Sequence, residues 1–142
     1  MSSIYNSLHQ AHSEIEREIL ELETIIGARE VNYPNALHVL KKLFKMWDKH
    51  EEQEEEVFIN LQKRGFTIPV KKIIFEHGKL KKKRDALANA IYSGSHVKAQ
   101  EALRKDGLQL IRDLREHMKM EDWVLYALPQ NVLSKEERTK LF

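Results

Sequence analysis

Apolar residues recur at intervals of three and four positions over most of the chain, which is the spacing of a helix with one buried face. Stretches that contain Gly, Pro or Ser interrupt this spacing at residues 27–34, 65–69 and 93–95, and Pro129 marks a further break. The pattern therefore predicts four long helices, over residues 4–26, 35–64, 70–92 and 97–128.

Each predicted helix has one apolar stripe that we expect to face a common core. Helices of this length with short connections predict an all-α, up-down-up-down four-helix bundle, and no strand pattern competes with it. The stripes consist of Leu8, Ile15, Ile19, Leu22 and Ile26 in the first helix, Leu40, Leu43, Trp47, Val57 and Leu61 in the second, Ile73, Leu80, Leu87 and Ile91 in the third, and Leu103, Leu110, Leu114, Val124 and Leu128 in the fourth.

The last residues of the chain carry a separate signal. Ser134 is followed three positions later by Glu137, which is the spacing of a capping box at the start of a helix. We therefore expect a short fifth helix after Pro129. A length of 142 residues suits one domain, so we interpret residues 1–142 as a single unit.

Histidines interrupt all four apolar stripes. In the second and fourth helices a glutamate follows the histidine after four residues, as His50 to Glu54 and His117 to Glu121. Residues four apart lie on one face of a helix, so each pair points an imidazole and a carboxylate toward the core. An unpaired carboxylate is costly to bury, and a shared metal ion is the simplest way to satisfy it.

The polar residues of the four stripes form a donor set of imidazoles and carboxylates without sulfur. Such a set suits iron, manganese or zinc, and two carboxylates that can bridge suit two ions better than one. A single buried histidine is more often a satisfied core residue, so the prediction rests on the joint occurrence. The candidate metal ligands are His12, His50, Glu54, His77, His117 and Glu121.

Other acidic and imidazole side chains are weaker candidates. Glu16 is also four residues from His12, but it lies beside the stripe, and we expect it to face solvent. We also expect His9, His38 and His96 to be exposed. Glu51 and Glu55 are further carboxylates near His50 and Glu54.

Composition excludes several classes of function. The net charge of +2 does not favour binding to nucleic acid, and no apolar run is long enough to span a membrane. The absence of Cys excludes disulfides, thiolate zinc sites and iron–sulfur clusters, and it fits a cytoplasmic protein. The first residues lack the charged start and apolar region of a signal peptide.

Two stretches resemble the hemerythrin-like family, in particular its cation-binding His-His-Glu branch. They are residues 50–58 (HEEQEEEVF) and 117–129 (HMKMEDWVLYALP), and residues 8–12 and 76–80 are similar to the family's first and third helices. The resemblance covers nearly the whole chain. It implies a non-haem di-iron centre with Glu54 and Glu121 as bridging carboxylates and four histidines as terminal ligands. It also implies a small gaseous ligand, O2 or NO.

The chain departs from the oxygen-carrying members of the family. Ile73 stands where they have a second histidine on the third helix, and Glu121 is better placed on the stripe than Asp122, which matches their last-helix aspartate. The ligand set is more similar to the iron- and oxygen-sensing branch, in which the residue equivalent to Glu51 also coordinates. The cysteine-bearing segment of family members linked to iron–sulfur repair is absent.

Three functions remain open from the sequence. The first is a di-iron protein that binds or senses O2, NO or iron. The second is a di-iron redox enzyme such as a ferroxidase or peroxidase, but the Glu-x-x-His motif of ferritin-like enzymes does not occur here. The third is a metal-free helical interaction module. The residues favour a binding or sensing protein over a catalyst.

Overall fold

A computed structural model describes residues 4–93 and 95–131 of the chain, and every element in these ranges is a helix. The elements are α1 (Ile4–Ile26), α2 (Tyr33–Lys63), α3 (Val70–Ser93), α4 (His96–Ala102), the π-helical segment η1 (Leu103–Gly107) and α5 (Leu108–Asn131). Because α4, η1 and α5 follow one another directly, the described chain forms four long helical segments. The capping box at residues 134–137, where we expect the short fifth helix to begin, lies outside the described residues.

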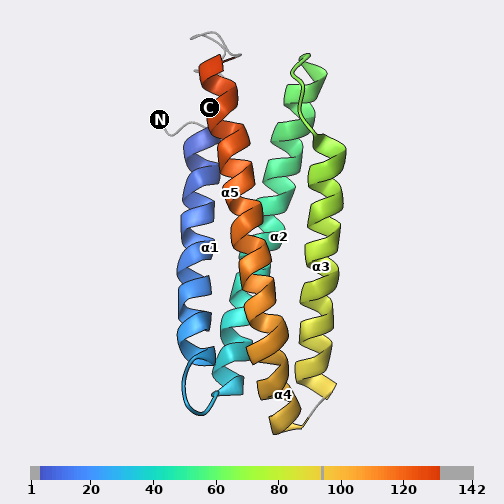
Figure 1. Cartoon of the computed structure of the whole chain (residues 1–142). Helices are drawn as coiled ribbons and strands as arrows, with labels where there is room; N and C mark the ends of the chain where they lie inside the picture. Colours follow the sequence, from blue (N-terminus) through green and yellow to red (C-terminus); the bar gives the residue numbers. More distant parts are fainter. Residues whose placement is uncertain (1–3, 94, 132–142) are drawn as a thin grey trace.

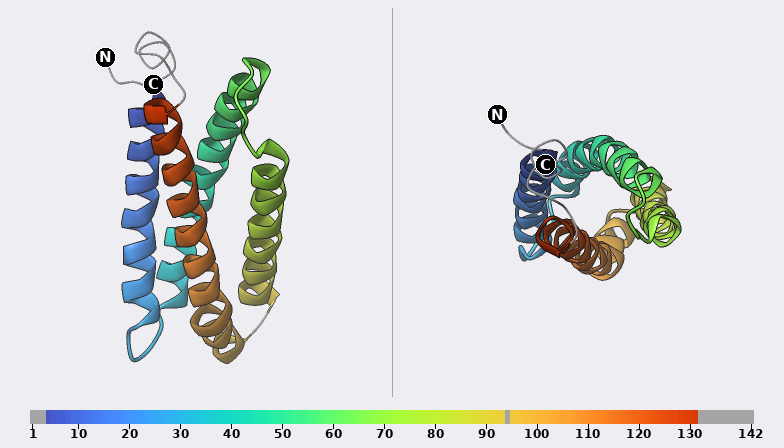
Figure 2. Two further views of the ribbon diagram at one scale, coloured as in Figure 1. Left: turned by 45° about the horizontal axis from the view of Figure 1, so that its top comes forward. Right: turned by 90° about the horizontal axis from the view of Figure 1, so that it is seen from above.

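The four segments lie side by side around a common axis (Figures 1 and 2). The α1–α2 connection, the end of α3 and the start of α4 lie at one end of the molecule, and the α2–α3 connection lies at the other end (Figure 1). This arrangement turns one stripe of each segment toward the interior.

Helix α2 begins two residues earlier than the sequence pattern predicts. The side chain of Asn32 accepts a hydrogen bond from the backbone N–H of Asn35 at 3.2 Å, and Pro34 occupies the first turn, where its missing N–H costs nothing. The proline that we interpreted as part of a loop therefore belongs to the helix. At the other end, Gly65 has a φ of 95°, a left-handed conformation that glycine adopts without strain.

The fourth segment is not the uninterrupted α-helix that we predicted. Its π-helical turn, η1, ends at Gly107, which is buried against Ile26 of α1. Periodicity alone does not reveal a single wide turn, because the apolar stripe continues on both sides of it. Helix α5 also continues through Pro129 to Asn131, where we predicted an end at Leu128.

The buried apolar residues form two clusters, one on each side of a polar layer. The larger cluster includes Ile15, Trp47 and Leu114, and the smaller one includes Leu8 and Phe58. On α2, the buried position that we assigned to Val57 belongs to Phe58, which is fully buried, while Val57 is only partly buried. No helix in the described part of the chain is long and apolar enough to cross a membrane.

Candidate metal centre

The polar layer between the two apolar clusters consists of the six predicted ligands. All are buried, with exposed fractions of 1% for Glu54 and Glu121 and 3–7% for the four histidines. They come from all four helical segments, because each occupies the inward stripe of its own helix. The structure therefore brings together every residue of the predicted set: His12, His50, Glu54, His77, His117 and Glu121.

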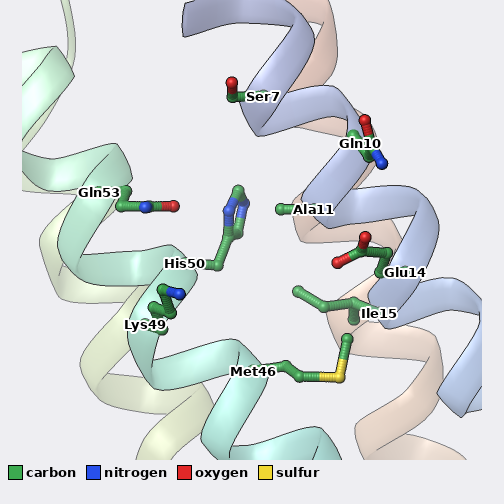
Figure 3. Close-up of a pocket in the computed structure, with 9 residues that line it drawn as sticks. All are labelled: Ser7, Gln10, Ala11, Glu14, Ile15, Met46, Lys49, His50 and Gln53. Carbon is green, nitrogen blue, oxygen red and sulfur yellow. The ribbon is translucent and has the colours of Figure 1, made fainter.

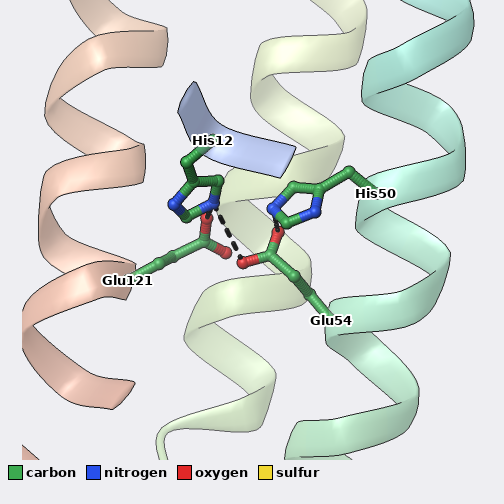
Figure 4. A group of neighbouring side chains, drawn as sticks. All are labelled: His12, His50, Glu54 and Glu121. Atoms are coloured by element: carbon green, nitrogen blue, oxygen red, sulfur yellow. Dashed lines mark ion pairs between the residues drawn. The ribbon is translucent and has the colours of Figure 1, made fainter. Parts of the chain in front are cut away.

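The first group of donor atoms joins α1, α2 and α5 (Figure 4). His12 Nε2 lies 3.5 Å from Glu54 Oε2 and 3.4 Å from Glu121 Oε1. His50 Nε2 lies 3.2 Å from Glu54 Oε1, one helical turn along α2. The ligand atoms of these four residues are close enough to one another to hold one metal ion.

The second group joins α3 and α5 and shares Glu121 with the first. Glu121 Oε2 lies 3.1 Å from His77 Nε2 and 3.0 Å from His117 Nε2. The two oxygens of Glu121 thus face different groups. Glu54 also reaches toward both, since its Oε1 lies 3.9 Å from His77 Nε2.

Several donor atoms in the centre are buried and lack a hydrogen-bond partner. They include His12 Nε2 and His117 Nε2, together with one oxygen each of Glu54 and Glu121. Leaving such atoms unsatisfied is costly inside a protein. A metal ion in each of the two groups would satisfy these atoms, so the residues fit bound metal.

Carboxylates outside the centre accept hydrogen bonds from three of the four imidazoles through Nδ1, the ring nitrogen that faces away from the centre. Asp122 accepts from His12 Nδ1 at 2.7 Å, Glu55 from His77 Nδ1 at 3.1 Å, and Glu76 from His117 Nδ1 at 3.2 Å. Each of these bonds joins two different helices. Metal-binding histidines commonly have such partners, which fix the ring so that Nε2 points at the metal.

Sequence reasoning missed these three outer carboxylates as a set. Asp122 follows Glu121, Glu55 follows Glu54, and Glu76 precedes His77. A neighbouring residue on a helix is rotated by about 100° from the inward face. It therefore lies at the seam with the next helix, so acidic neighbours of stripe residues were the available signal.

The carboxylates change the acid–base behaviour of the histidines. Burial alone would lower the pKa of His12, but Asp122, Glu121 and Glu54 outweigh burial and raise this pKa to about 11. His77 shows the same balance: burial lowers its pKa, and Glu121 and Glu55 raise it to about 9. The pKa of His117 is raised too, because Glu121 outweighs burial.

The pKa of Glu121 shifts downward, opposite to the pKa values of the histidines. Burial favours its neutral form, but the imidazoles of His117, His12 and His77 hold its pKa well below the usual range. Glu121 is therefore ionised in the metal-free centre, which is the form that can bind a metal.

Glu51, the further candidate ligand, lies outside both groups of donor atoms. It is partly buried and accepts a hydrogen bond from the indole N–H of Trp47, and burial raises the pKa of its carboxyl. Among the weaker candidates, His9, His38 and His96 are exposed, as expected. Glu16 is only partly exposed and binds Arg115 of α5, so it too lies away from the centre.

The fold and this buried cluster define a helical-bundle protein with a candidate metal site. The family model described as the hemerythrin HHE cation-binding domain matches residues 3–128, and the chain belongs to that family. Searches of curated proteins and of solved structures found no match.

Proposed function

We propose that this chain is a non-haem di-iron protein that binds or senses O2, NO or iron. The observation that carries the proposal is the position of Glu121, whose Oε1 faces His12 while its Oε2 faces His77 and His117. A carboxylate placed in this way can bridge two ions. Family membership and the sulfur-free donor set support iron, and the same donors also suit manganese and zinc.

Each residue of the centre has a distinct part in this proposal. Glu54 and Glu121 would bridge the two ions, and His12, His50, His77 and His117 would complete their coordination. Asp122, Glu55 and Glu76 would orient three of the rings. The apolar layers on both sides would exclude water, and the iron pair would supply open coordination positions for a small gas molecule.

The position of the helix connections supports an up-down-up-down course for the four segments (Figure 1). In such a bundle, ligands from all four segments meet at the middle of the core. The proposed centre therefore needs no residue from another chain.

The experiment that tests the proposal is metal analysis after anaerobic loading with Fe(II), followed by absorption spectra before and after air. We expect two irons per chain and new near-ultraviolet and visible bands on exposure to O2. Bands that disappear on degassing would indicate reversible binding, and irreversible oxidation would indicate sensing or redox chemistry. No iron above trace level, or zinc alone at full occupancy, would contradict the proposal.

The second candidate is a metal-free helical interaction module. It is favoured by the hydrogen bond within the centre between His77 Nε2 and Glu121 Oε2, at 3.1 Å. In that case the centre would be a buried polar network that needs no ion. Stability after metal removal distinguishes the two functions.

A further inference from the structure

His50 is the exception among the four buried imidazoles. Its Nδ1 is buried and has no hydrogen-bond partner, whereas the Nδ1 atoms of His12, His77 and His117 each meet a carboxylate. The side chain of His50 is only 4% exposed, so bulk water does not satisfy this atom. The absence of a hydrogen-bond partner for this nitrogen therefore needs a separate explanation.

A pocket of about 360 Å³ between α1 and α2 has His50 among its lining residues. Figure 3 shows the imidazole pointing into it, with Gln53 and Lys49 beside His50 on α2. All three side chains of this α2 wall can donate hydrogen bonds. Ser7, Gln10, Ala11 and Glu14 of α1 form the opposite wall, and Ile15 and Met46 form an apolar part.

We propose that this pocket binds a small carboxylate anion, which accepts a hydrogen bond from His50 Nδ1 and pairs with Lys49. The proposal rests on the di-iron function, because a metal on Nε2 makes Nδ1 a donor. The bound anion would take the part that Asp122, Glu55 and Glu76 take for the other rings. The positive charge of Lys49 favours an anion over a cation. The negative charge of Glu14 on the α1 wall repels that anion, so we place it on the α2 side of the pocket.

The test uses the chain loaded with zinc, which is diamagnetic, after metal analysis has established full occupancy. Sodium acetate is added at constant ionic strength with sodium chloride, and nitrogen-15 NMR follows the four buried imidazoles. We expect a saturable shift of the His50 Nδ1 signal, with much smaller changes at His77 and His117. Sodium chloride alone should leave His50 unchanged.

Two variants locate the anion. Lys49→Met should weaken acetate binding about tenfold through loss of a charge-assisted contact, while Lys45→Met, one turn away and outside the pocket, should not. Ala11→Leu should fill the pocket and abolish the His50 shift.

Other outcomes overturn the proposal. With zinc at full occupancy, a His50 signal that does not respond to acetate would overturn the anion site but not the metal centre. Equal shifts at all four rings would also overturn the anion site, because they would place acetate on the metal. A chain that binds no metal would overturn both this proposal and the di-iron function.

Discussion

At the scale of single residues, both groups of donor atoms depend on Glu121. We expect Glu121→Gln to lower metal content per chain more than a mutation of a residue that belongs to only one group, because an amide keeps the shape but loses the charge that would bridge the two proposed cations. Glu18→Gln is the matched control, since Glu18 is also buried but pairs with Lys42 at 2.8 Å, outside the centre. Metal analysis after identical loading measures the effect. Equal metal content in both variants would contradict the assignment.

Asp122 belongs to neither group of donor atoms and contacts the centre through His12. Its hydrogen bond to His12 Nδ1 is the shortest of the three outer contacts, at 2.7 Å. Asp122→Asn should therefore weaken metal affinity roughly 10- to 100-fold, the usual effect of removing such a partner. Competition with a chelator measures this affinity. Asp113→Asn, which removes a carboxylate paired with Lys83 away from the centre, should leave it unchanged.

The raised pKa values predict the pH dependence of metal binding. At pH 7 the imidazoles of His12 and His77 are protonated in the metal-free centre, since their pKa values are about 11 and 9. A metal binds only neutral imidazole, so binding should release at least the protons of these two rings and become tighter as pH rises. Zinc titration calorimetry in two buffers with different ionisation enthalpies counts the protons. An enthalpy that is the same in both buffers would show that no proton is released.

Those pKa values have the opposite consequence for the metal-free fold. A histidine whose pKa is raised by folding stabilises the native state fully below its unfolded pKa of about 6.5. That contribution is lost as pH rises through about 9 for His77 and about 11 for His12. Rising pH therefore weakens the metal-free protein while it strengthens metal binding.

At the scale of elements, a glycine inside a helix and a glycine in the turn after a helix should respond oppositely to substitution by alanine. Gly78 lies within α3, and a Cβ there would meet nothing within 4 Å. Gly78→Ala should raise the free energy of unfolding by roughly 0.5–1 kcal/mol, because alanine loses less backbone entropy in a helix. Gly65→Ala should lower it by roughly 1–2 kcal/mol, because alanine is strained at a φ of 95°. Urea unfolding measures both, and equal signs would contradict this account.

The sequence predicts helix interiors better than their ends. Periodicity placed His12, His50, His77 and His117 on inward faces, because one buried face per helix makes the spacing of apolar residues visible. The start of α2 depends instead on one hydrogen bond that the Asn32 side chain accepts, and η1 depends on one wide turn. Such local features do not alter the spacing of apolar residues, so that spacing does not reveal them.

The candidate site shows the same division. Its six inward residues could be predicted because each interrupts an apolar stripe. For the outer contacts, the sequence offers only the acidic neighbours of stripe residues, and it does not say which histidine each one meets, since that depends on which helices are neighbours. Glu51 and Glu55 lie four residues apart on α2, yet Glu51 meets Trp47 and Glu55 meets His77.

At the scale of the whole molecule, the polar centre divides the apolar core into two clusters. The four helical segments therefore meet in the middle through buried imidazoles and carboxylates rather than through apolar packing. Without a metal, several of these atoms lack hydrogen-bond partners. The proposed metal is thus expected to join the two halves of the core.

Removal of the metal should accordingly destabilise the whole bundle. A metal that binds only the native state at a hundred times its Kd adds about 2.7 kcal/mol, which corresponds to a fall in Tm of roughly 10 °C on chelation for a domain of this size. Differential scanning calorimetry of loaded and chelated protein measures the difference. Glu121→Gln serves as the control, since its Tm should respond little to chelator. An unchanged Tm in the parent protein would favour the metal-free module, in which the buried histidines and glutamates satisfy one another.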